Sequence, residues 1–125
     1  MENLVTTFIA AGVVIKKDAK KINREAVEIA KIVAEKYNPE KIILFGSVAR
    51  GEVRKYSDID LCIIKNTRLP SHKRIWKVYE LLRGYEYKYG LEPIVFTPKE
   101  FSEREKYENY FIRNILKDGK ILYER

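Results

Sequence analysis

The sequence is short of cysteine and glutamine: it has one cysteine, Cys62, and no glutamine among 125 residues. A lone cysteine excludes a disulfide bond within the chain, which is typical of a protein kept in a reducing cytoplasm. Cys62 lies in an apolar run, and we expect it to be a small buried residue rather than a ligand or a nucleophile. The missing glutamine and a charged fraction of 34% favour a thermophilic source.

Long hydrophobic runs are also missing. The longest mostly apolar segment, residues 4–15, is too short for a helix that crosses a bilayer. It lacks the positive leader of a secretory signal, since Glu2 precedes it and the lysines follow it. We expect residues 1–18 to form an N-terminal segment for packing or contact with a second copy, and residues 19–125 to form one domain. The only histidine, His72, has no partner and is expected to be exposed at a helix start.

The charge balance limits the partners without identifying them. The chain has 25 basic and 18 acidic residues, which gives a net charge of +7. This charge favours polyanionic partners such as a nucleoside triphosphate or a nucleic acid. A lysine-rich solvated surface explains it equally well. The hydrophobic fraction of 46% indicates a folded domain, in which we find no repeat, linker or low-complexity tract.

Hydrophobic periodicity predicts a mixed α/β domain of the α+β type, with a small sheet and helices packed against it. Residues 72–89 are interpreted as one helix that tolerates Gly84, although an alternating strand over residues 85–89 is the alternative. Thr97 begins a capping box, after which helix is expected to continue to Lys117. The predicted helices are 20–37, 72–89 and 97–117, with a helical turn near 48–51; the predicted strands are 41–45, 58–64, 91–96 and 121–123.

The most informative stretch joins the first two predicted strands. Gly46 and Ser47 directly follow the first strand, and Asp58 and Asp60 open the second. Side chains alternate along a strand, so both aspartates point to one face, roughly 7 Å apart at the backbone. Two carboxylates aimed at one place repel each other unless a cation or a shared proton intervenes. The pattern therefore indicates a metal site.

Both aspartates are hard oxygen ligands of the kind that Mg²⁺ prefers. Glu92 opens the third predicted strand and is the candidate for a third carboxylate in a two-metal clamp; the alternative is an ordinary surface residue. Glycine at 46 allows a close backbone approach to a ligand, and the Ser47 hydroxyl with nearby N–H groups could cradle phosphate oxygens.

Three cations lie in the connection between these strands. Arg50 could offer a two-pronged contact to phosphate, or it could pair with Glu52 or Asp58. Arg54 and Lys55 are interpreted as solvated loop charges.

The stretch Gly46-Ser47, ten residues and then Asp58-Ile59-Asp60 resembles the minimal nucleotidyltransferases of the DNA polymerase β superfamily. The likeness extends through residues 92–98 to the closing residues 119–123, and so covers roughly residues 20–123. It implies a nucleotidyltransferase fold, Mg²⁺ dependence, and transfer of a nucleoside monophosphate, with AMP expected, from a triphosphate such as ATP.

The resemblance also implies roles for individual residues. Gly46 and Ser47 would hold the triphosphate, and Asp58 and Asp60 would bind the metals. Glu92 stands where the family usually has aspartate, and would help to activate the acceptor hydroxyl. Glutamate is one methylene longer and Pro93 follows it, so its reach depends on the geometry of this strand.

Minimal members of this family are often paired with a small helical HEPN toxin, which they neutralise by adenylylating a tyrosine. The resemblance therefore implies an antitoxin with a HEPN-type partner. Two alternatives come from other classes: a non-catalytic module that binds nucleotide or nucleic acid, and a homodimer formed through residues 1–18.

Overall fold

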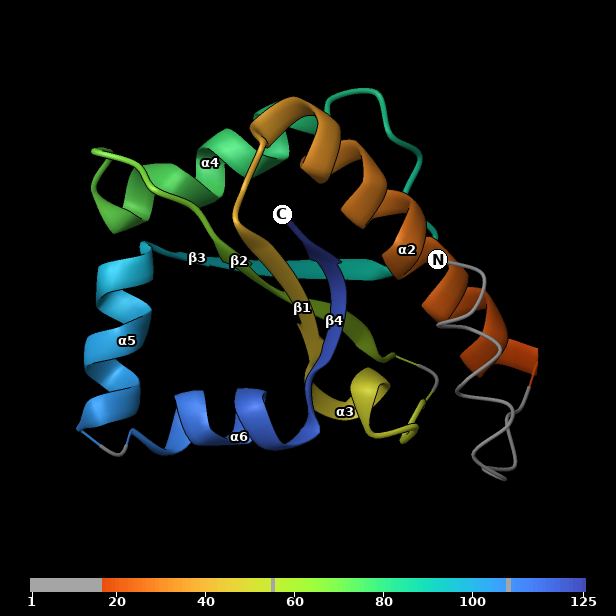
Figure 1. The fold of residues 1–125 in the computed structure, drawn as a ribbon. Coiled ribbons are helices and arrows are strands. Elements are labelled where there is room, and N and C mark those ends of the chain that lie inside the picture. The colour runs from red at the N-terminus through yellow and green to blue at the C-terminus, as the bar shows by residue number, and fades with distance from the viewer. Residues whose placement is uncertain (1–16, 55, 108) are drawn as a thin grey trace.

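The computed structural model describes residues 17–54, 56–107 and 109–125 (Figure 1). The N-terminal segment expected over residues 1–18 lies outside the described residues, except for positions 17 and 18 at the start of the first helix. The elements are α2 Lys17–Tyr37, β1 Lys41–Phe45, α3 Gly46–Ala49, β2 Asp58–Ile64, α4 Ser71–Leu81, β3 Gly90–Phe96, α5 Pro98–Lys106, α6 Tyr110–Asp118 and β4 Lys120–Glu124.

The four strands form one mixed sheet in the order β3-β2-β1-β4. Strand β1 lies antiparallel to both β2 and β4, whereas β2 and β3 are parallel. The parallel pair requires a crossover, which α4 supplies. The expected α+β class with a small sheet is confirmed.

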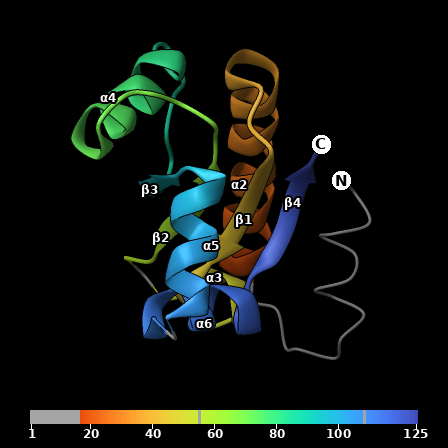
Figure 2. The same cartoon turned by 60° about the vertical axis from the view of Figure 1, so that its left-hand side comes forward.

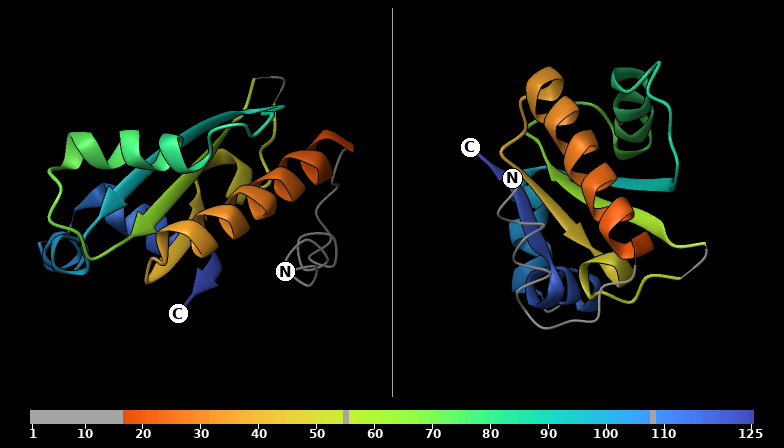
Figure 3. Two further views of the ribbon diagram at one scale, coloured as in Figure 1. Left: turned by 90° about the horizontal axis from the view of Figure 1, so that it is seen from above. Right: turned by 90° about the vertical axis from the view of Figure 1, so that its right-hand side faces the viewer.

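Helices cover both faces of the sheet (Figure 2). Helices α2 and α4 lie over one face, where they bury the alternate strand residues Leu44, Leu61 and Val95. Helices α5 and α6 lie over the other, where Ile112 and Ile115 of α6 pack against the sheet. The two views of Figure 3 show α2 and α4 on the same side. The strand residues buried on the second face are Ile43, Cys62, Ile64 and Phe96.

The period-2 alternation determines what lies beside this second core. Cys62 and Phe96 belong to it, so Asp60 and Glu92, at even spacing along the same strands, share its face. Cys62 is buried, as expected, and desolvation raises the pKa of its thiol to about 12. His72 is exposed in the first turn of α4, also as expected.

Strand β3 is an edge strand whose outer side is covered by side chains of α4. The Tyr79 hydroxyl donates to the Leu91 carbonyl at 2.7 Å, and Arg74 Nη1 donates to the Val95 carbonyl at 3.3 Å. Pro93 lies between these two positions and shares their outward side, where a missing N–H interrupts no ladder hydrogen bond. Proline therefore leaves the pairing of Glu92 with β2 intact.

The prediction of one helix over residues 72–89 is wrong beyond Leu81, and so is the strand alternative over 85–89. The chain turns at Gly84, whose φ is 91°. The backbone N–H groups of Lys88 and Tyr89 then donate to the carboxylate of Glu25 at 2.9–3.2 Å. A contact with α2, rather than local periodicity, determines this segment.

The helix expected over residues 97–117 is two helices. The capping box forms as predicted: Glu100 N donates to Thr97 Oγ1 at 3.1 Å, and Thr97 N to Glu100 Oε1 at 2.8 Å. Helix α5 ends before Tyr107, and Asn109 begins α6 by accepting from the N–H groups of Phe111 and Ile112. Across 17–54, 56–107 and 109–125, no helix has the length and apolarity needed to cross a membrane.

Candidate active site

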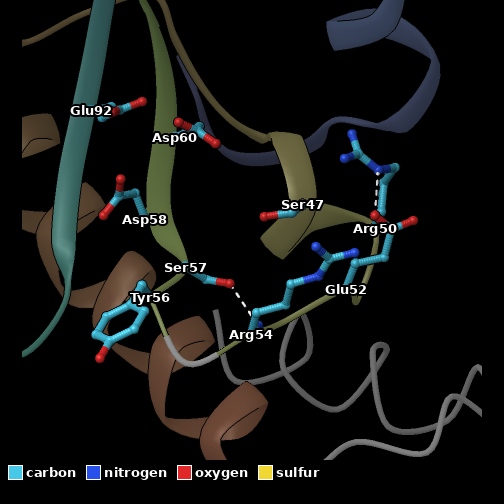
Figure 4. A pocket seen from close by; sticks show the side chains of 9 residues that line it. All are labelled: Ser47, Arg50, Glu52, Arg54, Tyr56, Ser57, Asp58, Asp60 and Glu92. Atoms are coloured by element: carbon cyan, nitrogen blue, oxygen red, sulfur yellow. Dashed lines mark hydrogen bonds and ion pairs between the residues drawn. The ribbon is translucent and has the colours of Figure 1, made fainter.

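Three carboxylates project from one face of the sheet at the beginning of two parallel strands (Figure 4). Asp58 and Asp60 open β2, and Glu92 lies near the start of β3. Asp60 and Glu92 are direct register partners, while Asp58 is paired with Gly90. The strand register therefore brings together the three acids singled out from the sequence.

Two glycines leave room for the aspartates. A Cβ on Gly46 would collide with Oδ2 of Asp60, and a Cβ on Gly90 would collide with Oδ1 of Asp58. Gly46 also has a φ of 76°, which few other residues adopt. The backbone thus approaches each carboxylate to a distance that a side chain would prevent.

Without a bound cation, the three carboxylates repel one another. Burial raises the pKa of Asp60 to about 6, assisted by a hydrogen bond to Glu92 and by the charges of Glu92 and Asp58. The nearby Arg50 acts in the opposite direction but does not cancel the effect. The site therefore favours either a bound proton or a cation.

The donor set suits Mg²⁺ with substrate oxygens as further ligands. Within the described part of the chain, no three histidine, cysteine or acidic side chains converge tightly enough to hold an ion by themselves. Mg²⁺ commonly binds through one or two carboxylates and completes its shell with water and phosphate oxygens. Asp58 and Asp60, which form no ion pair with another described residue and offer only oxygen donors, fit that type of site.

The Gly46-Ser47 pair begins the short helix α3 directly after β1. The Ser47 carbonyl accepts from the N–H of Glu52 at 2.9 Å, and the Gly46 carbonyl accepts from Arg50 N at 3.2 Å. These bonds close the turn and leave the Ser47 side chain facing a cavity of about 580 Å³. The residues that line this cavity are Ser47, Arg50, Glu52, Arg54, Tyr56, Ser57, Asp58, Asp60 and Glu92.

Five of the six predicted site residues thus border one cavity. The sixth, Gly46, packs against the carboxylate of Asp60. Arg50 adopts one of its alternatives: its Nε forms an ion pair with Oε2 of Glu52 at 3.3 Å. Both side chains remain substantially exposed.

From the sequence alone, Glu52 was only a possible partner of Arg50, Tyr56 and Ser57 had no role in the site, and Arg54 was assigned to solvent. Ser57 Oγ accepts from the Arg54 N–H at 2.7 Å, and the Arg54 carbonyl accepts from Ser57 N at 3.1 Å. This reciprocal pair fixes the backbone just before the aspartates. Only their closeness to Asp58 in the sequence could have predicted that these residues line the cavity.

Residues 26–122 match the protein family described as Nucleotidyltransferase domain. The chain is 35% identical over 116 residues to the "Putative protein adenylyltransferase MJ1305" of Methanocaldococcus jannaschii, covering 86% of this chain and 76% of that protein. A second protein of that organism, "Putative protein adenylyltransferase MJ0604", is 34% identical over 84 residues, which cover 67% of this chain and 78% of that protein.

Two solved structures share the fold. A structure described as that of a "putative nucleotidyltransferase from Sulfolobus solfataricus" superposes with a TM-score of 0.59 and 23% identity, over 88% of this chain and 90% of that one. Another, described as "Crystal structure of the toxin-antitoxin with AMP-PNP", gives a TM-score of 0.57 and 19% identity, over 80% of this chain and 73% of that one.

Proposed function

This chain belongs to the nucleotidyltransferase domain family, and we propose that it transfers AMP from ATP to a hydroxyl group of a protein, with Mg²⁺. The observation that carries the proposal is the pairing of Asp60 with Glu92 in register, with Asp58 on the same face and Ser47 across the same cavity. The names of the relatives support a protein as acceptor, and the AMP-PNP named with the toxin–antitoxin structure supports an adenine nucleotide.

In this proposal Asp58 and Asp60 hold Mg²⁺ together with the triphosphate. The metal, when bound, neutralises phosphate charge and polarises the α-phosphoryl group. Gly46 keeps Asp60 close to the backbone, and the Ser47 hydroxyl donates to a phosphate oxygen. Arg50 becomes available to the phosphates once Glu52 releases it.

Glu92 accepts the proton of the attacking hydroxyl on a carboxylate oxygen. The acceptor oxygen then forms a bond to the α-phosphorus, while the bond from that phosphorus to the bridging oxygen of the β-phosphate breaks. The electron pair of that bond leaves with pyrophosphate. Every atom of ATP is accounted for: AMP on the acceptor and pyrophosphate in solution.

We further propose a tyrosine of a HEPN-type toxin as the acceptor, which would make this chain the antitoxin. The motif resemblance and the toxin–antitoxin neighbour support this assignment.

The test of transfer is incubation of the protein with ATP labelled at the α-phosphate, Mg²⁺ and candidate acceptor proteins. The proposal expects label on a protein acceptor, lost in Asp58→Asn and absent with γ-labelled ATP. Label that stays on ATP with every acceptor, while an active relative assayed in parallel transfers it, would count against the reaction.

The test of the acceptor is co-expression with a HEPN-type protein, followed by mass spectrometry. The expected result is a complex in which a tyrosine of the partner has gained the mass of AMP. A partner that stays unbound and unmodified, in a preparation that labels another protein, would remove the HEPN assignment and leave the transfer reaction standing.

A further inference from the structure

We propose that Arg54 binds the β- and γ-phosphates of ATP, the part that leaves as pyrophosphate, and that it contributes more to this binding than Arg50 does. The inference rests on the proposed function and adds a ligand contact to the same site. It also changes the interpretation of Arg54, which the sequence placed among solvated loop charges.

The first support is the way Arg54 is held. Its backbone is fixed by the reciprocal hydrogen bonds with Ser57, 2.7 Å for the Arg54 N–H to the Ser57 hydroxyl. Its side chain lines the same cavity as Ser47 and the three carboxylates. Ser57 directly precedes Asp58, so these two bonds tie the backbone of Arg54 to the residue next to a proposed metal ligand.

The second support is the difference between the two arginines. Arg50 is paired with Glu52 at 3.3 Å, so part of its charge is already offset. Among the described residues, the guanidinium of Arg54 has no acidic partner within ion-pair distance. A guanidinium without a carboxylate partner is the better site for phosphate oxygens, since it loses no existing bond when they bind.

The third support is position relative to the reaction centre. In the view of Figure 4, the Ser47 side chain lies between the three carboxylates and the Arg54 guanidinium. The α-phosphate must lie at the carboxylates, where the new bond forms. The remaining phosphates then extend past Ser47 toward Arg54, where its charge stabilises the negative charge that develops on pyrophosphate.

Calorimetry on the full chain with Mg²⁺ tests this inference, with ATP and AMP as the two probes. Arg54→Gln should weaken ATP binding about tenfold and change AMP binding less than about twofold, because AMP lacks the β- and γ-phosphates. Arg54→Lys should recover part of the loss. Arg50→Gln should have a smaller effect, and Glu52→Gln should strengthen ATP binding by freeing Arg50. Arg68→Gln, the same change on an exposed loop, is the matched control.

Three results would overturn the inference. ATP affinity unchanged in Arg54→Gln would remove Arg54 from the site and leave the proposed function intact. Equal weakening of ATP and AMP would place Arg54 at the α-phosphate or in a structural role. If the wild-type protein itself bound no ATP, the proposed function would fail together with the inference.

Discussion

Asp60 lies against Gly46, so closely that a Cβ on the glycine would overlap the carboxylate oxygen Oδ2. The two residues come from opposite ends of the same connection: Gly46 begins the first turn after β1, and Asp60 lies near the beginning of β2. Their contact joins the turn proposed to hold the phosphates to an acid proposed to bind Mg²⁺. A glycine at 46 is therefore required for two separate reasons, its φ of 76° and the space for Asp60.

Three glycine-to-alanine variants separate these reasons. Gly84→Ala adds only backbone strain, because φ at this position is 91° while nothing lies within 4 Å of the added Cβ. It should lose about 1 kcal/mol of unfolding free energy. Gly46→Ala should lose more, and Gly90→Ala, with no positive φ, should mainly displace Asp58. Urea unfolding and Mg²⁺–ATP calorimetry check this: equal ATP binding by Gly84→Ala and Gly90→Ala would contradict the packing argument.

The raised pKa of Asp60 predicts a pH dependence of stability in metal-free protein. The pKa of Asp60 is about 6 in the folded state against an ordinary value of 3.8, so between these two values the folded state retains a proton that the unfolded state has released. The contribution of Asp60 to the free energy of unfolding is complete below its unfolded-state pKa of 3.8. It is lost as pH rises through the folded-state pKa of about 6. Asp60→Asn should therefore stabilise the protein at pH 7 by about 1–2 kcal/mol, less than the full shift since solvent screens the group.

The measurement is urea unfolding in EDTA of wild type and Asp60→Asn between pH 4 and pH 7.5. The extra free energy of unfolding of Asp60→Asn over wild type should vanish as the pH approaches 4. Glu100, whose pKa is lowered by its bond to Arg74, pushes stability the other way and is common to both proteins. A gain independent of pH would mean that Asp60 is not destabilised by its neighbours.

Glu92→Gln should reduce the rate of AMP transfer by about a hundredfold or more, the usual contribution of a general base. The fold should survive because Glu92 is exposed on an edge strand. Glu80→Gln, the same change at an exposed position of α4, is the control. A rate within a few-fold of wild type would return Glu92 to its alternative interpretation as a surface residue.

Arg74 should be important for stability and not for nucleotide binding. It is 6% exposed and donates to the Leu69 and Val95 carbonyls and to both carboxylate oxygens of Glu100, the last at 2.6 and 3.2 Å. Arg74→Ala removes the donor to the Leu69 and Val95 carbonyls and leaves Glu100 only its bond from Thr97 N, so it should cost about 3 kcal/mol. Urea unfolding measures the loss, and unchanged ATP affinity in the folded protein is the matching expectation.

The sequence predicted those parts whose causes are local. Strands at 41–45 and 58–64 follow from β-branched apolar runs. The capping-box residues Thr97 and Glu100 predict where helix α5 begins. The aspartates were found because strand alternation alone places them on one face. The juxtaposition of Glu92 with Asp60 needed more, namely the parallel register that only the crossover through α4 provides.

The parts that could not be predicted depend on distant contacts. Residues 82–89 leave the helix because Glu25, more than sixty positions earlier, binds two of their N–H groups. The role inferred for Arg54 depends on which arginine pairs with Glu52, and spacing does not decide that. Asn109 was a missed signal, because an asparagine before an apolar periodic run is a common N-cap.

Calorimetry of a non-hydrolysable ATP analogue, with and without Mg²⁺, tests the central claim most directly. The account predicts that Mg²⁺ strengthens binding to wild-type protein at least tenfold and has no such effect on the Asp58→Ala, Asp60→Ala double variant. Affinity that is independent of Mg²⁺ and equal in the two proteins would contradict it.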